Sequence, residues 1–532
     1  MLGIKSKNVF WGLITICVLH LVANIIWLAW DKAPPAWDQA AHIRSVVLAN
    51  QWMSGEFWGG FGDLVKAFGG YPPLVYLLGG VWSLLFGVGV AQITFVNSIV
   101  LVFVLVGLFK LILEIYKDEK LALGVTVLFS FMPVVYDISR NMLLDLALSG
   151  WVVWGLWSLV KSKYLIEFKW GLVWLLCLMG ASLTKINGFI YFFPMVVWVI
   201  YAWFKKDEIK IFRNLAVYGV LYLGLVGWWW LVNKENIINY LTGLAGTGEK
   251  LTDPMNLGDW QTWIHYFRLM LLHQVSPIPT LIWLGVLGVC KKGKFRKISF
   301  LIFFGLVNYV IFTIIKNKDF RFTLPMLPIV AITLVMGLKE MGRVKIWISW
   351  ILVIWMGWMY INNSFGFPIR KPWVVATPTF VAGDVEWIGI DDYPVRSPKS
   401  EEWPQKFIIN DLEKMAVDKG HKISVLVLIN REEINDNNLG MYKEIMGTDA
   451  FEPGSVGSRE RFQSENEIEG LVGEYDAVLV PDSTYEPAPF YGINLEAYRQ
   501  ARDWALTHPE RLELVANYYV YGTENLYLMK VR

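Results

Sequence analysis

The chain has 532 residues, of which 55% are hydrophobic and 18% are charged, and its formal net charge is +2. Soluble domains carry about 25% charged residues, so this composition indicates a membrane protein. The near balance of 48 basic and 46 acidic residues gives no reason to expect a nucleic-acid partner. The three cysteines, Cys17, Cys177 and Cys290, have neither a disulfide framework nor the spacing of a zinc site.

Apolar residues gather in blocks long enough to cross a bilayer, whose hydrocarbon core needs about 20 residues of helix. The hydropathy criterion gives roughly eleven such blocks. They cover residues 9–30, 93–116, 121–139, 143–160, 170–184, 187–204, 212–233, 266–290, 298–315, 322–338 and 345–361. A further apolar segment, 73–91, is rich in glycine, and it either crosses the membrane or lies within it without crossing.

The composition changes to that of a soluble domain after Tyr360. Runs typical of buried strands alternate there with stretches of helical periodicity, which predicts an α/β domain with a partly parallel sheet. The predicted strands cover 423–429, 477–481, 512–521 and 524–531, and the predicted helices cover 406–419 and 495–506. Residues 431–468 are polar and predicted to be loop-rich. We therefore divide the chain into a membrane domain, 1–361, and a soluble domain, 362–532.

Basic residues cluster between some of the apolar blocks and not between others. The clusters lie at 5–7, 161–163, 205–213, 291–297 and 339–345. Under the positive-inside rule these segments are cytoplasmic, so the N-terminus is inside and the C-terminal domain is extracytoplasmic. The outer segments are then 31–72, 234–265 and 316–321. This alternation requires that 73–91 does not fully cross.

The first predicted outer loop carries Asp38 directly after the first apolar block. A carboxylate there can accept a proton from a hydroxyl group, and low water access would raise its pKa toward a useful value. The competing interpretation is a helix cap, because Asp is a favoured N-cap residue. His42 lies one turn further on the same face, where a lone histidine is more often a surface residue. Tyr71 precedes two prolines, which suit the start of the next apolar helix.

Charged residues also lie at the predicted outer edge of the membrane, where they are costly and usually functional. Arg140 could bind a phosphate as a fork, or form a structural pair with Asp145. Lys185 could neutralise a lipid phosphate or extend to the headgroups. Arg321 belongs to another outer cluster of cations. Together Arg140, Lys185 and Arg321 predict positive charge on the outer side, as a polyprenyl phosphate would require.

In order and spacing these features resemble the GT-C superfamily of polytopic glycosyltransferases. The resemblance is to the branch that holds protein O-mannosyltransferases and aminoarabinose lipid A transferases, and it covers roughly residues 1–360. The matching landmarks are the Asp38 loop, Tyr71-Pro72-Pro73-Leu74, Arg140 with Asp145, Thr184-Lys185, and Arg321 followed by Leu324-Pro325 and Leu327-Pro328.

The resemblance implies a multi-pass, mostly α protein of the cell envelope, with a GT-C-like bundle of about eleven transmembrane helices and a C-terminal extracytoplasmic α/β domain. It implies a polyprenyl-phosphate sugar donor, a glycan, lipid or protein acceptor with a free hydroxyl, and surrounding membrane lipids as partners. Asp38 is then the general base of an inverting transfer. The substrate-binding residues would be His42, Tyr71, Arg140, Asp145, Lys185 and Arg321.

Two positions depart from the pattern of many relatives. An Asp-Glu pair is frequent where this chain has Asp38-Gln39, and an acidic residue with a lysine is frequent where it has Gly70-Tyr71. The second carboxylate, and any divalent metal cofactor that it would bind, are therefore left open. Glu56 and Asp63 are the other carboxylates of this loop.

A transporter or flippase for a lipid or a lipid-linked sugar is the alternative function. Such transporters often show paired inverted repeats and broken helices near the middle of the membrane. The sequence shows no such repeat, and its intramembrane charges cluster at the outer edge. These features favour an enzyme.

Overall fold

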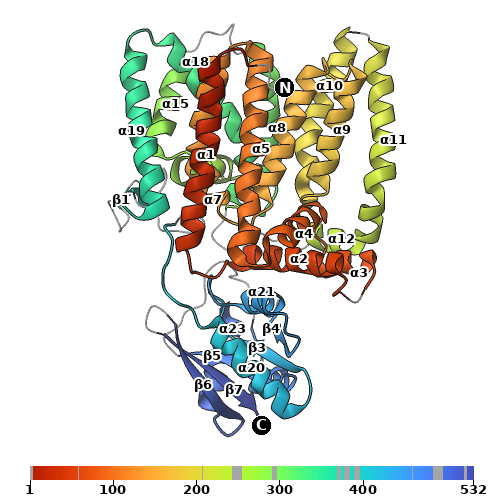
Figure 1. Cartoon of the computed structure of the whole chain (residues 1–532), viewed down its shortest axis with the longest axis vertical. Helices are drawn as coiled ribbons and strands as arrows, with labels where there is room; N and C mark the ends of the chain where they lie inside the picture. Colours follow the sequence, from red (N-terminus) through yellow and green to blue (C-terminus); the bar gives the residue numbers. More distant parts are fainter. Residues whose placement is uncertain are drawn as a thin grey trace.

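The computed structural model describes the whole chain except residues 1–3, 58, 207, 243–253, 290–295, 368–372, 377–383, 389–395, 458, 460, 483–494 and 521–523. Part of the basic cluster at 291–297 thus lies outside the described residues. The chain folds into a helical bundle with a smaller α/β domain at one end (Figure 1). The N-terminus lies at the opposite end of the bundle.

Seven described segments are helical, long and apolar enough to cross a membrane. They are Lys7–Trp30 (α1), Val90–Tyr116 (α5), Ile186–Lys206 (η1 and α10), Ile209–Val232 (α11), Arg296–Ile314 (η3 and α17), Phe320–Glu340 (η4 and α18) and Val344–Phe365 (α19). The other predicted blocks form the shorter helices Glu119–Ser130 (α6), Pro133–Ile138 (α7), Asp145–Lys161 (α8), Phe168–Ser182 (α9), Trp260–Leu269 (α14) and Pro277–Val289 (α15). The predicted helical membrane fold is confirmed, while the count of eleven crossings stays a prediction.

Two of the predicted blocks are each divided into two helices. Block 121–139 becomes α6 and α7 because Pro133, at the first position of α7, has no N–H to continue the preceding helix. Block 266–290 is interrupted by a π-helical turn, Met270–Gln274 (η2), after which α15 starts at Pro277. Both interruptions place irregular backbone inside the bundle.

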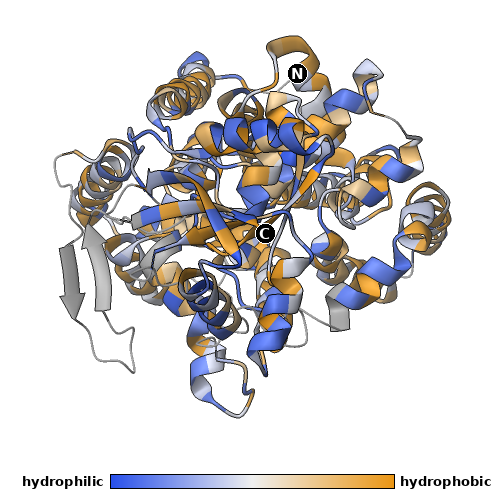
Figure 2. Cartoon of the chain, turned by 90° about the horizontal axis from the view of Figure 1, so that it is seen from below, coloured by the Kyte–Doolittle hydropathy of each residue, from blue (hydrophilic) through white to orange (hydrophobic). Residues whose placement is uncertain are grey.

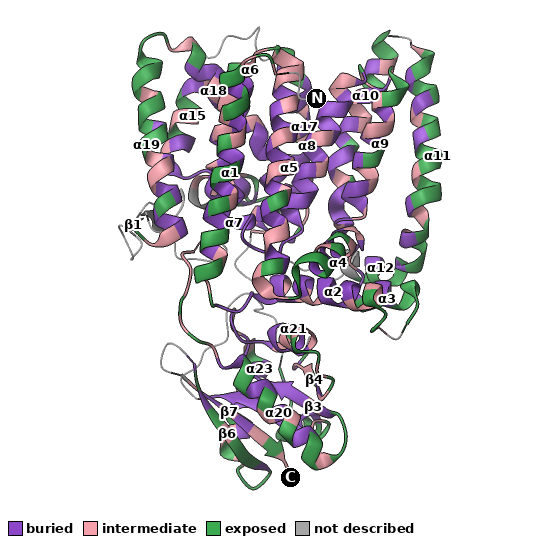
Figure 3. Ribbon diagram, in the orientation of Figure 1, coloured by how far each residue is buried: buried purple, intermediate pink, exposed green. Residues whose placement is uncertain are grey.

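The sides of the bundle carry exposed apolar residues, as a membrane domain requires. On α11 and α19 the large exposed side chains include Val220, Leu231, Trp347 and Ile354. Figure 3 shows exposed residues along both helices, while α8, in the middle of the bundle, is mostly buried. These exposed faces are where lipid would contact the protein.

Three shorter helices lie at the end of the bundle that faces the α/β domain (Figure 1). They are α2 (Trp37–Ser54), α3 (Phe61–Ala67) and α4 (Leu74–Phe86). The 13 residues of α4 span only about 20 Å at 1.5 Å per residue, which is less than the hydrocarbon core of about 30 Å. This length agrees with the expectation that segment 73–91 does not fully cross.

The glycines of α4 allow it to lie close against α2. A Cβ atom on Gly79 would lie 2.8 Å from Cγ2 of Val46, and one on Gly80 would lie 3.2 Å from the carbonyl carbon of Ala49. Any larger residue would push the two helices apart. The glycine-rich composition of this segment is therefore a packing feature.

The C-terminal domain has a five-stranded sheet in the order β4-β3-β5-β7-β6. Its strands are Ile423–Val427 (β3), Phe451–Gly454 (β4), Ala477–Pro481 (β5), Leu512–Val520 (β6) and Glu524–Val531 (β7). β3 pairs in parallel with β4 and β5, and the β6–β7 hairpin joins antiparallel to β5. The predicted partly parallel sheet is confirmed. A separate antiparallel pair, Trp373–Ala376 (β1) and Asp384–Ile388 (β2), precedes it.

Four helices pack with the five-stranded sheet, namely Gln405–Lys419 (α20), Asp436–Met446 (α21), Glu465–Gly473 (α22) and Leu495–Thr507 (α23). Viewed from this end, Figure 2 shows hydrophilic residues on the domain and hydrophobic residues along the bundle helices around it. The expectation of a loop-rich segment at 431–468 is wrong, because α21, β4 and the start of α22 lie there. The predicted boundary after residue 361 falls inside α19, which ends at Phe365.

Candidate active site

Asp38 is the second residue of α2, and its side chain contacts Arg321, which lies 283 positions away in the sequence. The cap position belongs to Ala36, so Asp38 is not the N-cap residue. One carboxylate oxygen, Oδ2, accepts hydrogen bonds from Nη1 and Nη2 of Arg321 at 3.3 and 3.2 Å. A carboxylate in a first helical turn is also favoured by the helix dipole. The Asp38 side chain remains 38% exposed, so a substrate can reach it.

Arg321 is held by the turn from which it projects. Its backbone N–H and its Nε both donate to the carboxylate of Asp319, at 2.8 and 2.7 Å. Asp319 caps η4 (Phe320–Met326) by this contact. The buried guanidinium is therefore shared between Asp319 and Asp38, which fixes its direction.

Lys185 and Asp145 form the second ion pair of the site. Nζ of Lys185 lies 2.7 Å from Oδ1 of Asp145, and the two side chains are only 12% and 3% exposed. The lysine comes from the turn between α9 and η1, and Asp145 is the first residue of α8. Lys185 also lies 5.3 Å from the ring centre of Phe322, the residue after Arg321. The two ion pairs thus lie side by side.

These five side chains carry two positive and three negative charges, namely Arg321 and Lys185 against Asp38, Asp145 and Asp319. Each cation is already matched by a carboxylate. Of the three cations that the sequence predicts on the outer side, Lys185 and Arg321 belong to this cluster. An incoming anion would have to compete with the carboxylates for the two cations.

The pKa of Asp38 reflects this pairing. Burial raises the pKa of the carboxyl group, but the nearby positive charges, above all that of Arg321, lower it by more. The net pKa lies below its ordinary value. The expectation of a raised pKa is therefore wrong, because it considered burial without the arginine that the fold brings from 283 positions away.

His42 and Tyr71 lie next to Asp38 on the inner side of α2. His42 is buried, and its Nδ1 lies 2.8 Å from the hydroxyl of Tyr76 on α4. The ring of Tyr71 packs perpendicular to the imidazole at 5.1 Å between centres. Burial lowers the pKa of His42 to about 4, so the ring is neutral at physiological pH. The interpretation of His42 as a surface histidine is wrong. Sequence analysis missed Tyr76, which the apolar pattern of α4 concealed.

Arg140 lies in a different buried cluster. Its Nε donates to Oδ1 of Asn24 at 2.8 Å, and its guanidinium lies over the rings of Tyr136 and Tyr360 at 5.2 and 5.3 Å. Within the described part of the chain it forms no ion pair with Asp38 or with Asp145. The proposed Arg140–Asp145 pair is thus replaced by Lys185–Asp145, and the structure does not bring Arg140 together with the other candidates.

The remaining carboxylates of the outer loop do not join the site. Glu56 is exposed in the turn after α2, and Asp63 accepts a hydrogen bond from the backbone N–H of Gly60 at 3.1 Å. Among the residues that the structure describes, no three His, Cys, Asp or Glu side chains converge as a metal site. Because Asp38, Asp145 and Asp319 are each paired with a cation, the residues present do not fit a divalent metal.

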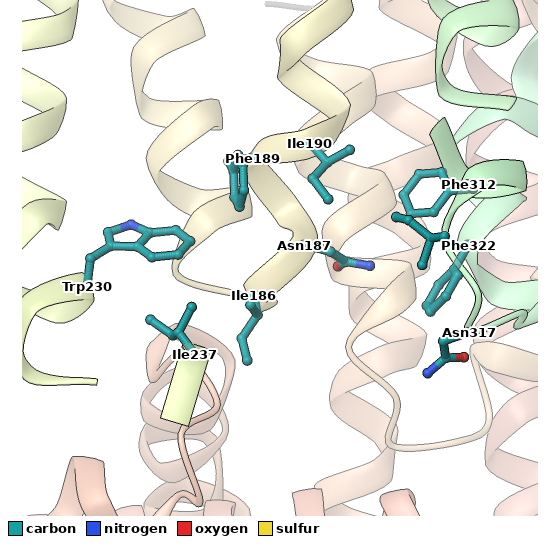
Figure 4. A pocket seen from close by; sticks show the side chains of 10 residues that line it. Ile186, Asn187, Phe189, Ile190, Trp230, Ile237, Phe312, Asn317 and Phe322 are labelled. Atoms are coloured by element: carbon teal, nitrogen blue, oxygen red, sulfur yellow. The ribbon is translucent and has the colours of Figure 1, made fainter. Parts of the chain in front are cut away.

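A small apolar pocket of about 70 Å³ adjoins the two ion pairs. Figure 4 shows side chains of η1 (Ile186–Phe192), α11 and α12 (Lys234–Thr242) on one side and those of α17 and η4 on the other. The lining residues are Ile186, Asn187, Phe189, Ile190, Trp230, Ile237, Phe312, Ile315, Asn317 and Phe322. Ile186 directly follows Lys185 and Phe322 directly follows Arg321, and Nζ of Lys185 lies 5.3 Å from the ring centre of Phe322, so the pocket adjoins both cationic residues along the chain. Among the described residues, no hydrogen-bond donor reaches the buried amide oxygens of Asn187 and Asn317.

A family model for dolichyl-phosphate-mannose-protein mannosyltransferases matches residues 5–243. This range includes Asp38, Asp145 and Lys185 and ends before Arg321. A search of curated proteins gives no match.

The fold resembles solved structures of glycosyltransferases over its whole length. ArnT from Cupriavidus metallidurans in the apo state aligns with a TM-score of 0.58 and 12% identity, over 98% of this chain and 98% of ArnT. The same protein bound to undecaprenyl phosphate aligns with a TM-score of 0.56 and 12% identity, over 97% of each chain. The arabinofuranosyltransferase AftD from Mycobacteria aligns with a TM-score of 0.57 and 11% identity, over 100% of this chain and 40% of AftD. The N-terminal part of this chain is thus similar to a family of lipid-phosphate-dependent mannosyltransferases, and the fold of the entire chain is similar to that of ArnT and AftD.

Proposed function

We propose that this protein transfers a sugar from a polyprenyl-phosphate donor to an acceptor hydroxyl on the extracytoplasmic side of the membrane, with Asp38 as the general base. One observation carries this proposal. The carboxylate of Asp38, which is 38% exposed, contacts Arg321 beside the Lys185–Asp145 pair, and the residues that directly follow the two cations line an apolar pocket.

The shape of the site supports a lipid-phosphate donor. An isoprenoid chain needs an apolar surface, which the pocket offers, and its phosphate needs cations, which Lys185 and Arg321 supply. The amides of Asn187 and Asn317 can donate to sugar hydroxyls or phosphate oxygens. The structural relative ArnT has been solved with undecaprenyl phosphate bound, and the matching family is named for a lipid-phosphate mannose donor. Both are consistent with this donor class.

The reaction follows from the positions of the charged groups. Asp38 takes the proton of the acceptor hydroxyl, and the acceptor oxygen forms a bond to the anomeric carbon. The bond between that carbon and the phosphate oxygen breaks, and polyprenyl phosphate leaves with the electron pair. Arg321 and Lys185 stabilise the charge that develops on the leaving phosphate. Attack from the side opposite the phosphate inverts the anomeric configuration.

Donor binding would also change the state of Asp38. A phosphate that approaches Arg321 competes with Asp38 for the same guanidinium, because that guanidinium is already shared with Asp319. Once released, Asp38 loses the contact that lowers its pKa and becomes a stronger base. The donor therefore activates the base that its own transfer requires.

A transfer assay with matched carboxylate variants tests this function. Purified protein in lipid nanodiscs is incubated with radiolabelled polyprenyl-phosphate mannose, arabinose and aminoarabinose, and release of polyprenyl phosphate is measured. Asp38→Asn should lower the rate by about 10²–10⁴-fold, the usual contribution of a general base. Glu56→Gln, which changes an exposed carboxylate of the same loop, should keep the rate of the unchanged protein. Full activity of Asp38→Asn would contradict the proposed role.

The same donors in sealed vesicles test the alternative function. Movement of intact lipid-linked sugar between leaflets, without release of polyprenyl phosphate, would identify a transporter and overturn the transferase proposal. Release and transfer by the unchanged protein, lost in Asp38→Asn, supports the transferase.

A further inference from the structure

The C-terminal domain forms hydrogen bonds and an ion pair with the loop between α1 and α2, the helix that carries Asp38. Arg396 forms a two-pronged ion pair with Asp31 at the end of α1, at 2.7 and 2.9 Å. The backbone N–H of Lys399 donates to the same carboxylate at 2.9 Å, and the backbone N–H of Lys32 donates to the carbonyl of Lys399. The start of the α1–α2 loop is thus fixed from outside the bundle.

The end of this loop is held by two buried asparagines of the C-terminal domain. Nε1 of Trp37 donates to Oδ1 of Asn430 at 2.7 Å. Nδ2 of Asn438 donates to the carbonyl oxygen of Pro35. Trp37 immediately precedes Asp38, so these contacts lie one and three residues from the proposed base.

The contact continues along α2. On the domain side, Met441 of α21 belongs to the same buried apolar cluster as Ile43 and Val47 of α2. Arg44 pairs with Glu444 of α21 at 3.3 Å. Two helices that share a packed core and an ion pair move together. The orientation of α2 therefore depends on the C-terminal domain.

In the first turn of α2, Ala40 packs into the same buried cluster as Met441, but the turn has no side-chain cap. Its cap residue, Ala36, has no side chain that could accept from the free backbone N–H groups. The contact between Asp38 and Arg321, at 3.2–3.3 Å, is at the long end of the range for a hydrogen-bonded ion pair. A small rotation of this turn would therefore separate Asp38 from Arg321.

We infer that the C-terminal domain is a positioning element of the active site, and that Asn430 and Asn438 are positioning residues that act through Trp37 and Pro35. They hold Asp38 beside Arg321, the cation at which the donor phosphate is proposed to bind, so that the base faces the reacting carbon. This inference rests on the proposed function, in which Asp38 is the base. It assigns the domain a part in the reaction through the placement of α2.

The hydrogen bond between Trp37 and Asn430 can be removed from either side. Trp37→Phe deletes the N–H donor and keeps an aromatic ring, and Asn430→Leu deletes the acceptor at similar volume. Trp52→Phe is the matched control, because Trp52 lies near the far end of α2 and packs on Phe61. In the transfer assay, each test variant should lose about tenfold in kcat, the kinetic equivalent of one hydrogen bond, while KM for the donor stays within about twofold. The double variant should be no slower than either single variant, because both remove the same bond.

If the hydrogen bond between Trp37 and Asn430 only stabilised the fold, its loss would lower the melting temperature and leave kcat unchanged. Loosening of the first turn should also move the acid limb of kcat/KM to higher pH, because Asp38 would lose the charge of Arg321. Unchanged kcat in both test variants, or an equal loss in Trp52→Phe, would overturn the inference.

Hydrogen exchange of the peptide that covers residues 31–44 gives a second measurement that needs no substrate. Trp37→Phe and Asn430→Leu should speed exchange there, and Trp52→Phe should not. If the unchanged protein transfers no sugar, the proposed function fails, yet faster exchange would still support positioning of α2. If transfer is normal and exchange in this peptide is unchanged by the test variants, the positioning inference fails alone.

Discussion

One guanidinium, that of Arg321, is shared by Asp38 and Asp319, and this sharing governs how the proposed base responds to its surroundings. Sequence analysis found both Asp38 and Arg321 because each is a charged residue at the predicted outer edge of the membrane. The same signal selected Arg140, which instead lies among aromatic rings and near Asn24. The charge of a residue and its predicted depth give its position along the membrane normal only. They could not show which of the cations lies next to Asp38.

The lowered pKa of Asp38 predicts the pH dependence of transfer. In the free protein the carboxylate stays ionised as the pH falls, so the acid limb of kcat/KM should lie below the ordinary Asp value of about 3.9. In the donor-bound protein the phosphate competes for Arg321, so the acid limb of kcat should lie at higher pH. Initial rates at low and saturating donor, from about pH 2 to 8, give both profiles. If the acid limb of kcat lay at the same pH as that of kcat/KM, or at a lower pH, the phosphate would not displace Asp38 from Arg321.

The buried pair of Lys185 and Asp145 should matter for stability as well as for transfer. Asp145→Asn leaves the lysine without its counter-charge, and breaking a buried ion pair costs about 3–5 kcal/mol. We expect a melting temperature several degrees lower in thermal unfolding of the detergent-solubilised protein. Adding Lys185→Met should restore the melting temperature but not the transfer rate.

The exposed pair of Lys163 and Glu167 serves as the control for this measurement. Solvent and salt screen such surface pairs, so Glu167→Gln should change the melting temperature little. A melting temperature of Asp145→Asn equal to that of the unchanged protein would show that the buried pair is not stabilising.

At the scale of elements, hydropathy alone did not predict where the apolar helices end or how closely they pack, which depend on glycine and proline. The apolar content of 73–91 fits a crossing helix, but the structure has a helix of 13 residues that packs on α2. The segment 431–468 was expected to be loop-rich because its sequence is polar, yet it contains α21, which docks on α2. Only a few apolar residues, such as Leu439 and Met441, mark the buried side of α21. An element stabilised mainly by its partner gives a weak pattern of its own.

The close approach of α4 to α2 predicts a large effect of a single side chain. Gly80→Val would place methyl groups against the backbone of Ala49 and Asn50, which cannot move aside without shifting α2. Overpacking of this kind costs about 1–3 kcal/mol, and the displaced helix should also lower kcat. Thermal unfolding and the transfer assay measure both effects. Gly219→Val on α11 is the control, because a Cβ atom there meets nothing within 4 Å. Equal behaviour of the two variants would contradict the packing argument.

At the scale of the molecule, the bundle and the C-terminal domain form one catalytic unit under our proposals. The N-terminus and the C-terminal domain lie at opposite ends of the bundle (Figure 1). This relative placement agrees with the arrangement that the basic clusters predict. Which end faces the cytoplasm is still a prediction, because the positive-inside rule is its only basis.

Accessibility labelling tests this orientation. We expect a cysteine at Lys414, a residue of α20 with a 74% exposed side chain, to react with a membrane-impermeant maleimide in intact cells. A cysteine at Lys206, at the end of α10, should react only after the membrane is permeabilised. The native Cys17 and Cys177 are buried, and Cys290, which lies outside the described residues, would be replaced by serine. Labelling of Lys206→Cys in intact cells would reverse the proposed orientation.

By itself the sequence determined the membrane class, the order of apolar helices, the soluble C-terminal domain and the charged candidates near the outer edge. These follow from local composition and periodicity, because a bilayer imposes fixed lengths and tolerates few charges. Only the tertiary structure decided which charges meet: Arg321 rather than Arg140 reaches Asp38, and Lys185 takes Asp145. It also decided the state of Asp38 and the contact of α21 with α2. The contacts of Lys185 with Asp145, Arg321 with Asp38 and Glu444 with Arg44 join groups 40, 283 and 400 positions apart. Their meeting is set by packing of the whole chain and by no local pattern.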